Sequence, residues 1–174
     1  MKSILIILSI LSFLSTPSDL NERATELKNY CYKNGYNTEY AILVDLGRPS
    51  LVKRLYLYDL KNEKVVMSTH AGHGSGGNSN ILYADFSNVN GSHCSSLGHY
   101  KIGKERKMYT KPYMAFEVDG LDATNSNARS RSILIHPSIL PLSYGCITLS
   151  PDNYDELSKH IHATSGNLIM WVYK

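Results

Sequence analysis

The fold is decided by residues 132–149, whose sequence is SILIHPSILPLSYGCITL. Two short apolar runs, 132–136 and 146–149, flank a turn-rich link and predict two β-strands. Pro137 disfavours helical backbone for the residue before it, so His136 should lie at the end of the first strand. The ends of the two strands can therefore bring the imidazole of His136 beside the thiol of Cys146.

An imidazole beside a thiol is the arrangement that a cysteine nucleophile needs, because the thiolate attacks and a base must take its proton. Cys146 is the expected nucleophile and His136 its base. The backbone N–H groups around Tyr144, Gly145 and Cys146 are expected to form an oxyanion pocket. No Asp or Glu occurs between residues 123 and 151, so the carbonyl of Pro137 is the simplest group to orient the histidine. The competing interpretation is a buried structural cysteine and a surface histidine.

The length and composition indicate one ordinary globular domain. The chain has 174 residues, of which 43% are hydrophobic and 19% charged, enough to bury a core. The formal net charge of +3 is too small to indicate nucleic-acid binding. We expect no nucleic-acid partner and a monomeric protein.

The N-terminus predicts export. One lysine at position 2 is followed by an apolar run over 4–14, too short for a membrane span of about 20 residues and typical of a signal peptide. We predict a signal peptide over 1–17, location in the periplasm or cell envelope, and no stable membrane span after its removal. An uncleaved membrane anchor is the alternative.

The remaining chain predicts a strand-rich α+β fold with a helix near the N-terminus and another before the last strand. Apolar residues spaced along 20–31 predict a helix within an N-terminal segment over 19–37, beginning at Asp19 and ending at Gly35. A second helix should begin at Ser150-Pro151. Strands are expected over 40–46, 54–59, 64–69, 98–102, 114–118, 132–136, 146–149 and 167–173. The glycine-rich stretch 71–99 is expected to be a functional loop.

The three cysteines, Cys31, Cys94 and Cys146, are an odd number, which leaves one free thiol or an intermolecular bridge after export. A pair between Cys31 and Cys94 would leave Cys146 free. Cys94 is a rival nucleophile but has a more obvious use in such a disulfide. Histidines in the glycine-rich stretch lack a strong ligand spacing, so we expect no metal and no cofactor.

The run Ser143–Leu149 resembles the Ser-His-Gly-Cys-Ile-Arg-Leu signature of murein L,D-transpeptidases, the YkuD-like catalytic domain. Its upstream Ile-His also matches. Further similar segments, in the same order as in that family, are 95–100 and 166–171, and the segments 71–76, 86–88 and 127–129 resemble one branch of the superfamily. The resemblance covers residue 40 to the C-terminus. It implies an L,D-transpeptidase-type β-sandwich and a catalytic domain over 38–174.

By this resemblance Cys146 is the nucleophile, His136 the general base, and Ser143 and Gly145 shape the site. The implied partners are peptidoglycan stem peptides. The implied reaction cleaves the L,D bond before D-Ala through a Cys146 thioester and passes the acyl group to a neighbouring stem, which gives a 3→3 cross-link. Water as the acceptor would make the protein an L,D-carboxypeptidase.

Two positions depart from the signature: Tyr144 replaces its histidine and Thr148 its arginine. Arg129 and Arg131 lie shortly before His136 and are the available replacements for the missing charge. Our hypothesis is that Arg129 supplies it, against a solvated surface arginine.

His73 and Ser96 are expected to contact substrate at the mouth of the site; the alternative for His73 is a plain surface histidine. The departures also leave open a non-catalytic peptidoglycan-binding module. A papain-type protease is disfavoured because its cysteine precedes its histidine in sequence.

Overall fold

The structure is a computed structural model, and it describes residues 17–108 and 112–174. All of the expected signal peptide except its last residue lies outside the described residues. The helices are α2 (Leu20–Asn34) and α3 (Pro151–Ala163). The strands are β1 (Tyr40–Asp45), β2 (Leu55–Asp59), β3 (Lys64–Thr69), β4 (His73–Gly74), β5 (Gly98–Lys107), β6 (Met114–Gly120), β7 (Leu134–Pro137), β8 (Leu142–Ser143), β9 (Ile147–Leu149) and β10 (Ile169–Tyr173).

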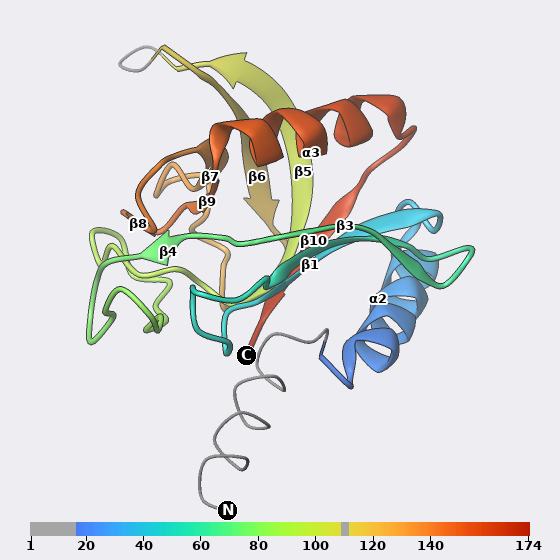
Figure 1. The fold of residues 1–174 in the computed structure, drawn as a ribbon, viewed down its shortest axis with the longest axis horizontal. Helices are drawn as coiled ribbons and strands as arrows, with labels where there is room; N and C mark the ends of the chain where they lie inside the picture. Colours follow the sequence, from blue (N-terminus) through green and yellow to red (C-terminus); the bar gives the residue numbers. More distant parts are fainter. Residues whose placement is uncertain (1–16, 109–111) are drawn as a thin grey trace, which may run out of the picture.

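Eight of the strands form one sheet in the order β3-β2-β1-β10-β5-β6-β7-β9, and β4 pairs with β8 in a small second sheet (Figure 1). Most neighbours in the large sheet are antiparallel. The exceptions are β1 with β10, near the middle, and β7 with β9, at one edge, which run parallel. The last strand, β10, therefore lies beside the first, β1. At the edge of the sheet β9 pairs with β7, and the expected nucleophile Cys146 lies immediately before β9.

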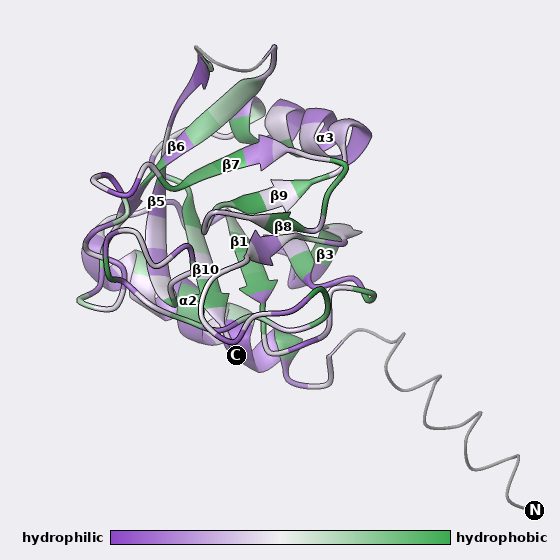
Figure 2. Cartoon of the chain, turned by 90° about the vertical axis from the view of Figure 1, so that its left-hand side faces the viewer, coloured by the Kyte–Doolittle hydropathy of each residue, from purple (hydrophilic) through white to green (hydrophobic). Residues whose placement is uncertain are grey.

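The sheet is buried on both faces because successive side chains of a strand point to opposite sides. In β1, Ile42 and Val44 pack into a core shared with α3, whereas Ala41 and Leu43 pack into a second core under α2. The two helices thus cover opposite faces. Figure 2 shows the hydrophobic colouring along the sheet strands and mostly hydrophilic colouring on α3.

The two helices end where the sequence indicates. Leu20, Ala24, Leu27 and Cys31 form the buried stripe of α2, and Gly35 ends that helix with φ +70°. A left-handed residue of this kind is a common helix terminator, and glycine adopts it without a Cβ penalty. In α3, Pro151 occupies the first turn and the buried residues are Tyr154 and Leu157. Proline suits that position because its missing N–H would have no helical partner there.

The predicted strand-rich α+β fold, with one helix near the N-terminus and one before the last strand, is confirmed. The 55–69 hairpin is present with its turn at 60–63. The stretch 71–99 contains β4 and bridges to other segments, so it is partly regular. The disulfide between Cys31 and Cys94 is not formed: Cys31 packs under α2, and all three cysteines are free. In the described part of the chain, no helix combines the length and apolar character needed to cross a membrane.

Candidate active site

The register of β7 against β9 brings His136 and Cys146 to one place. His136 pairs with Thr148 in this parallel ladder, and Cys146 lies two residues before Thr148. Neighbouring strands are about 4.8 Å apart and side chains alternate between faces, so the side chains of residues 136, 146 and 148 share a face. The strands predicted over 132–136 and 146–149 thus correspond to the adjacent strands β7 and β9, with His136 in β7 and Cys146 immediately before β9.

Two contacts orient the imidazole of His136. Its Nδ1 lies 3.0 Å from the carbonyl oxygen of Pro137, the acceptor expected from the sequence. The ring of Tyr113 stacks on the imidazole with ring centroids 5.3 Å apart and an interplanar angle of 4°. Burial first, and then the charge of Cys146, raise the pKa of the Tyr113 hydroxyl. Tyr113 is therefore common to both members of the pair.

Opposing influences act on the Cys146 thiol, which is partly buried. Burial raises the pKa of the thiol, because the thiolate is less well solvated inside the protein. Backbone N–H groups of Leu134 and Cys146, and the positive charge of Arg131, act in the opposite direction. The Sγ atom lies 3.8 Å from the carbonyl oxygen of Ser132. Burial outweighs these groups, so the pKa of the thiol lies above its ordinary value, and the contact with the Ser132 carbonyl also favours the protonated thiol.

The turn before the cysteine is fixed by Ser143 and Gly145. Gly145 has φ +113°, a backbone conformation that side chains disfavour, and a Cβ there would lie 2.8 Å from the carbonyl oxygen of Cys94. Ser143 Oγ is 2.8 Å from the carbonyl oxygen of Cys146 and accepts the N–H of Gly145 at 3.1 Å. The Gly145 amide is thus already used within the turn. Tyr144 projects outward, 75% exposed, and its ring contacts that of His93 at 4.5 Å.

His73 does not lie at the mouth of the site, which corrects that expectation. It is fully buried on β4, with Nδ1 2.6 Å from a guanidinium nitrogen of Arg54 and Nε2 3.0 Å from the carbonyl oxygen of Asn80. Its own carbonyl oxygen accepts the hydroxyl of Ser143 at 3.2 Å. A buried imidazole with both nitrogens hydrogen-bonded cannot reach substrate. His73 instead supports the turn through its carbonyl oxygen, which binds Ser143.

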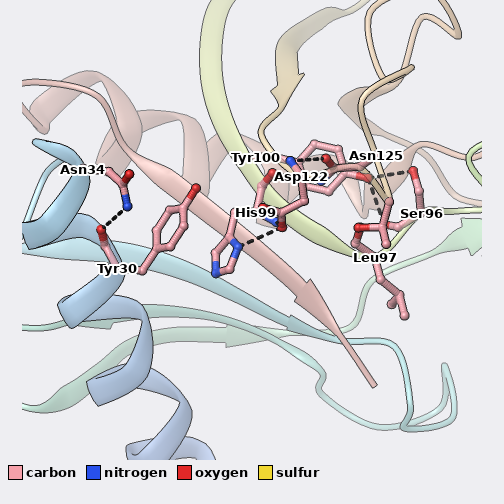
Figure 3. Close-up of polar contacts among 9 residues, drawn as sticks. Tyr30, Asn34, Ser96, Leu97, His99, Tyr100, Asp122 and Asn125 are labelled. Atoms are coloured by element: carbon pink, nitrogen blue, oxygen red, sulfur yellow. Dashed lines mark hydrogen bonds and ion pairs between the residues drawn. The ribbon is translucent and has the colours of Figure 1, made fainter.

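Ser96 is also buried rather than exposed to substrate. Its Oγ lies 2.8 Å from the hydroxyl of Tyr100 and 3.2 Å from a guanidinium nitrogen of Arg131. Figure 3 shows Ser96 beside Tyr100, with His99 and Asp122 in the same network. The expected substrate contact is therefore replaced by a structural one, in which Ser96 connects β5 to Arg131.

Arg129 is held away from the cysteine by two carboxylates on β6. Its guanidinium lies 2.5 Å from Glu117 and forms a second ion pair with Asp119. This pairing does not support the hypothesis that Arg129 supplies the missing charge, whereas the guanidinium of Arg131 lies beside the turn, 3.1 Å from where a Cβ at Gly145 would be. Sequence order could not separate two arginines that lie two positions apart in a tight turn.

The replacement of the signature arginine by Thr148 has a local reason. Thr148 is buried, and its carbonyl oxygen accepts the N–H of Gly72 at 2.7 Å. A Cβ added at Gly72 would lie 2.0 Å from Thr148 Oγ1. The side chain at 148 thus packs directly against the backbone before β4, where a long guanidinium would have no room.

Tyr113 was missed because nothing in its local sequence marks it. It lies after the β5 strand, in a stretch whose only signal is a proline at 112. Among the described residues, no three side chains of His, Cys, Asp or Glu gather closely enough to hold a metal ion.

The fold agrees with the comparison against protein families. The chain belongs to the L,D-transpeptidase catalytic domain family, whose model matches residues 16–173. The resemblance found in the sequence is thereby confirmed. No curated protein matches the chain.

The chain is also similar to solved structures at low sequence identity. Bd1075 from Bdellovibrio bacteriovorus is 18% identical, with a TM-score of 0.50, over 80% of this chain and 49% of that one. The helical cell shape determining protein Pgp2 from Campylobacter jejuni is 17% identical, with a TM-score of 0.48, over 76% of this chain and 46% of that one. An L,D-transpeptidase from Xylanimonas cellulosilytica is 14% identical, with a TM-score of 0.43, over 83% and 68%. The matched region is about half the length of the first two proteins.

Proposed function

We propose that this protein is an exported L,D-transpeptidase that acts on peptidoglycan stem peptides in the periplasm or cell envelope. Membership of the family supports a peptidoglycan-related transpeptidase. The observation that carries the proposal is the parallel register of β7 and β9, in which His136 pairs with Thr148, two residues after Cys146. The apolar run over 4–14 supports export.

In the first step, the Cys146 thiolate attacks the carbonyl carbon of the L,D bond before D-Ala. His136 takes the thiol proton and returns it to the amine nitrogen of D-Ala as the C–N bond breaks, which leaves a thioester on Cys146. An amine of a neighbouring stem then attacks the thioester. A new amide forms, the sulfur leaves, and His136 takes the amine proton, so the product is a 3→3 cross-link.

The tetrahedral intermediate needs N–H donors for its oxyanion. The Gly145 amide donates to Ser143, so the amides of Tyr144 and Cys146 are the donors we assign to this role. The carbonyl of Pro137 holds Nδ1 of His136 as the N–H tautomer, which directs the basic Nε2 toward the reacting groups. Tyr113 covers one face of the imidazole and restricts its rotation.

Incubation of the protein with purified tetrapeptide muropeptides, followed by mass analysis, tests the proposal. We expect dimers with 3→3 linkages from the wild-type protein and none from Cys146→Ala. A mass adduct on Cys146 with a carbapenem, a β-lactam that acylates such thiols, would report the thioester step by itself. Cys94→Ala is the matched control and should retain both activities, because Cys94 is buried behind the turn.

The products also separate the alternatives. Shortened stems without dimers would show that water is the acceptor, and the protein would then be an L,D-carboxypeptidase. A folded protein that binds muropeptides but leaves Cys146 unacylated would contradict the enzymatic proposal and indicate a binding module.

A further inference from the structure

The guanidinium of Arg131 lies beside the turn that precedes Cys146, 3.1 Å from where a Cβ at Gly145 would be. Arg131 ends a short turn in which its N–H donates to the carbonyl of Asn127 at 2.9 Å. The next residue, Ser132, has φ +54°, unusual for a residue with a side chain, and its carbonyl oxygen faces the sulfur of Cys146. The backbone beside Arg131 and the thiol are therefore in contact, and the strained residue between them fixes their relative position.

The side chain of Arg131 forms hydrogen bonds with one segment of the chain, residues 87–96. One terminal nitrogen donates to the carbonyl of Ser87 at 2.8 Å and to Ser96 Oγ at 3.2 Å. The other donates to Ser92 Oγ at 3.3 Å and to the carbonyl of Cys94. All four acceptors belong to residues 87–96, and a planar guanidinium with five N–H groups suits such a set better than an ammonium does.

This segment, residues 87–96, packs against the turn that precedes Cys146. Ser95 Oγ donates to the carbonyl of Gly145 at 3.2 Å and accepts the N–H of Gly74 at 2.9 Å. The carbonyl of Cys94 is the atom that a Cβ at Gly145 would meet first. Arg131 therefore reaches the residue before the nucleophile both directly and through residues 94 and 95.

The charge of Arg131 is not cancelled by a carboxylate. Within the described ranges, its polar partners are hydroxyl and carbonyl oxygens, and no Asp or Glu forms an ion pair with it. Arg129, two residues earlier, binds Glu117 and Asp119. The two arginines form a natural matched pair, in which one cation is neutralised by carboxylates and the other lies beside the turn that precedes Cys146.

We propose that Arg131 is the positioning residue of the site: it clamps residues 87–96 against the Gly145 turn and supplies the positive charge that favours the Cys146 thiolate. The inference rests on the proposed role of Cys146 as the nucleophile. It explains why the position after Cys-Ile can be a threonine in this chain, since the cation arrives from the preceding turn.

The test measures alkylation of Cys146 by iodoacetamide as a function of pH in the full chain, with peptide mapping to separate Cys146 from the other cysteines. We expect Arg131→Gln to slow alkylation at pH 7 about five- to tenfold and to move its midpoint to higher pH, because a nearby opposite charge is lost. Arg129→Gln is the control and should leave rate and midpoint unchanged. Cooperative thermal unfolding of each variant shows that it is folded.

Arg131→Lys separates charge from clamping. Lysine keeps the positive charge but lacks the planar guanidinium that binds several acceptors at once. The pH midpoint of Cys146 alkylation in this variant should therefore stay close to that of the wild-type protein, while muropeptide turnover falls. Unchanged turnover in Arg131→Lys, or unchanged alkylation in a folded Arg131→Gln protein, would overturn the proposal. Alkylation needs no peptidoglycan, so an inactive wild-type protein with a normal alkylation profile would count against the proposed function and not against Arg131.

Discussion

Gly145 is the residue on which the shape of the site depends most directly. Its φ of +113° and the close approach of the Cys94 carbonyl leave no room for a methyl group. Both constraints act on the peptide immediately before the nucleophile. A change here therefore moves the sulfur and the amides around it together.

We predict that Gly145→Ala destabilises the protein by about 1–3 kcal/mol, the usual strain of a side chain forced into such a conformation. Muropeptide turnover should fall at least about tenfold, since small displacements at the reacting atoms are costly. Urea unfolding and the product assay measure the two effects. Gly91→Ala is the control: Gly91 also has a positive φ, of +77°, but an added Cβ would meet nothing within 4 Å. Equal activity losses in the two variants would contradict this explanation.

At this scale the sequence predicted the pair but not its support. Cys146 and His136 stand next to recognisable strand and turn signals, and the Pro137 carbonyl followed from the lack of a nearby acid. Arg131 and Tyr113 reach the site through side-chain directions that depend on the turn at 127–132 and on the β5–β6 connection. Those directions are set by tertiary packing, which also buries His73 and Ser96, both of which were expected to contact substrate.

At the scale of elements, the helix ends were predictable because capping residues act locally: Gly35 and Pro151 mark the ends that the structure has. Strand positions were predictable from apolar runs. The parallel pairing of β1 with β10 was not, because it joins segments from opposite ends of the chain and no local pattern specifies it. The small β4–β8 sheet was missed for the same reason, as each strand has two residues.

The β4 element contains a buried acid-sensitive contact. Nδ1 of His73 lies 2.6 Å from the Arg54 guanidinium and must accept its hydrogen bond. Nε2 therefore carries the hydrogen and donates to the carbonyl oxygen of Asn80. Burial, and then the charge of Arg54, lower the pKa of His73 below its ordinary value of 6.5. Below pH 6.5 His73 is therefore protonated in the unfolded chain but still neutral in the folded chain. The free energy of unfolding decreases as the pH is lowered from 6.5 to the lower folded-state pKa of His73.

We predict that His73→Gln flattens this acid limb. The glutamine oxygen can accept from Arg54, and the side chain has no charge to gain. The free energy of unfolding, measured in urea between pH 7.5 and about pH 5, should decrease less in the variant than in the wild-type protein. The exposed His70, three positions away, gives the control variant His70→Gln, which should keep the wild-type slope. An unchanged slope in His73→Gln would assign the acid sensitivity to other groups.

At the scale of the molecule, the core under α2 lies away from the candidate site. The core under α2 contains Leu27 and Cys31 packed on β1, β2 and β10, whereas the site lies at the β7–β9 edge. Figure 1 shows α2 at the opposite side of the fold from β7, β8 and β9. Damage under α2 should therefore lower stability and leave the chemistry of the folded fraction intact.

We predict that Leu27→Ala costs about 2–5 kcal/mol, the range for emptying a fully buried leucine site. Alkylation of Cys146 in the folded protein should keep its rate. Thermal unfolding and the alkylation assay check the two statements. Tyr32→Ala, on the exposed face of the same helix, should change the free energy of unfolding by less than about 0.5 kcal/mol. A slower alkylation in Leu27→Ala below its melting range would show that α2 also supports the site.

The place of β10 in the sheet has a consequence for the order in which the strands can pair during folding. This strand, made from residues 169–173, separates β1 from β5, so the sheet cannot close until those residues have left the ribosome. Pairings of such long sequence separation form slowly, because the intervening chain must first be ordered. Completion of the large sheet therefore depends on residues 169–173, because β1 and β5 have no direct pairing with each other in it.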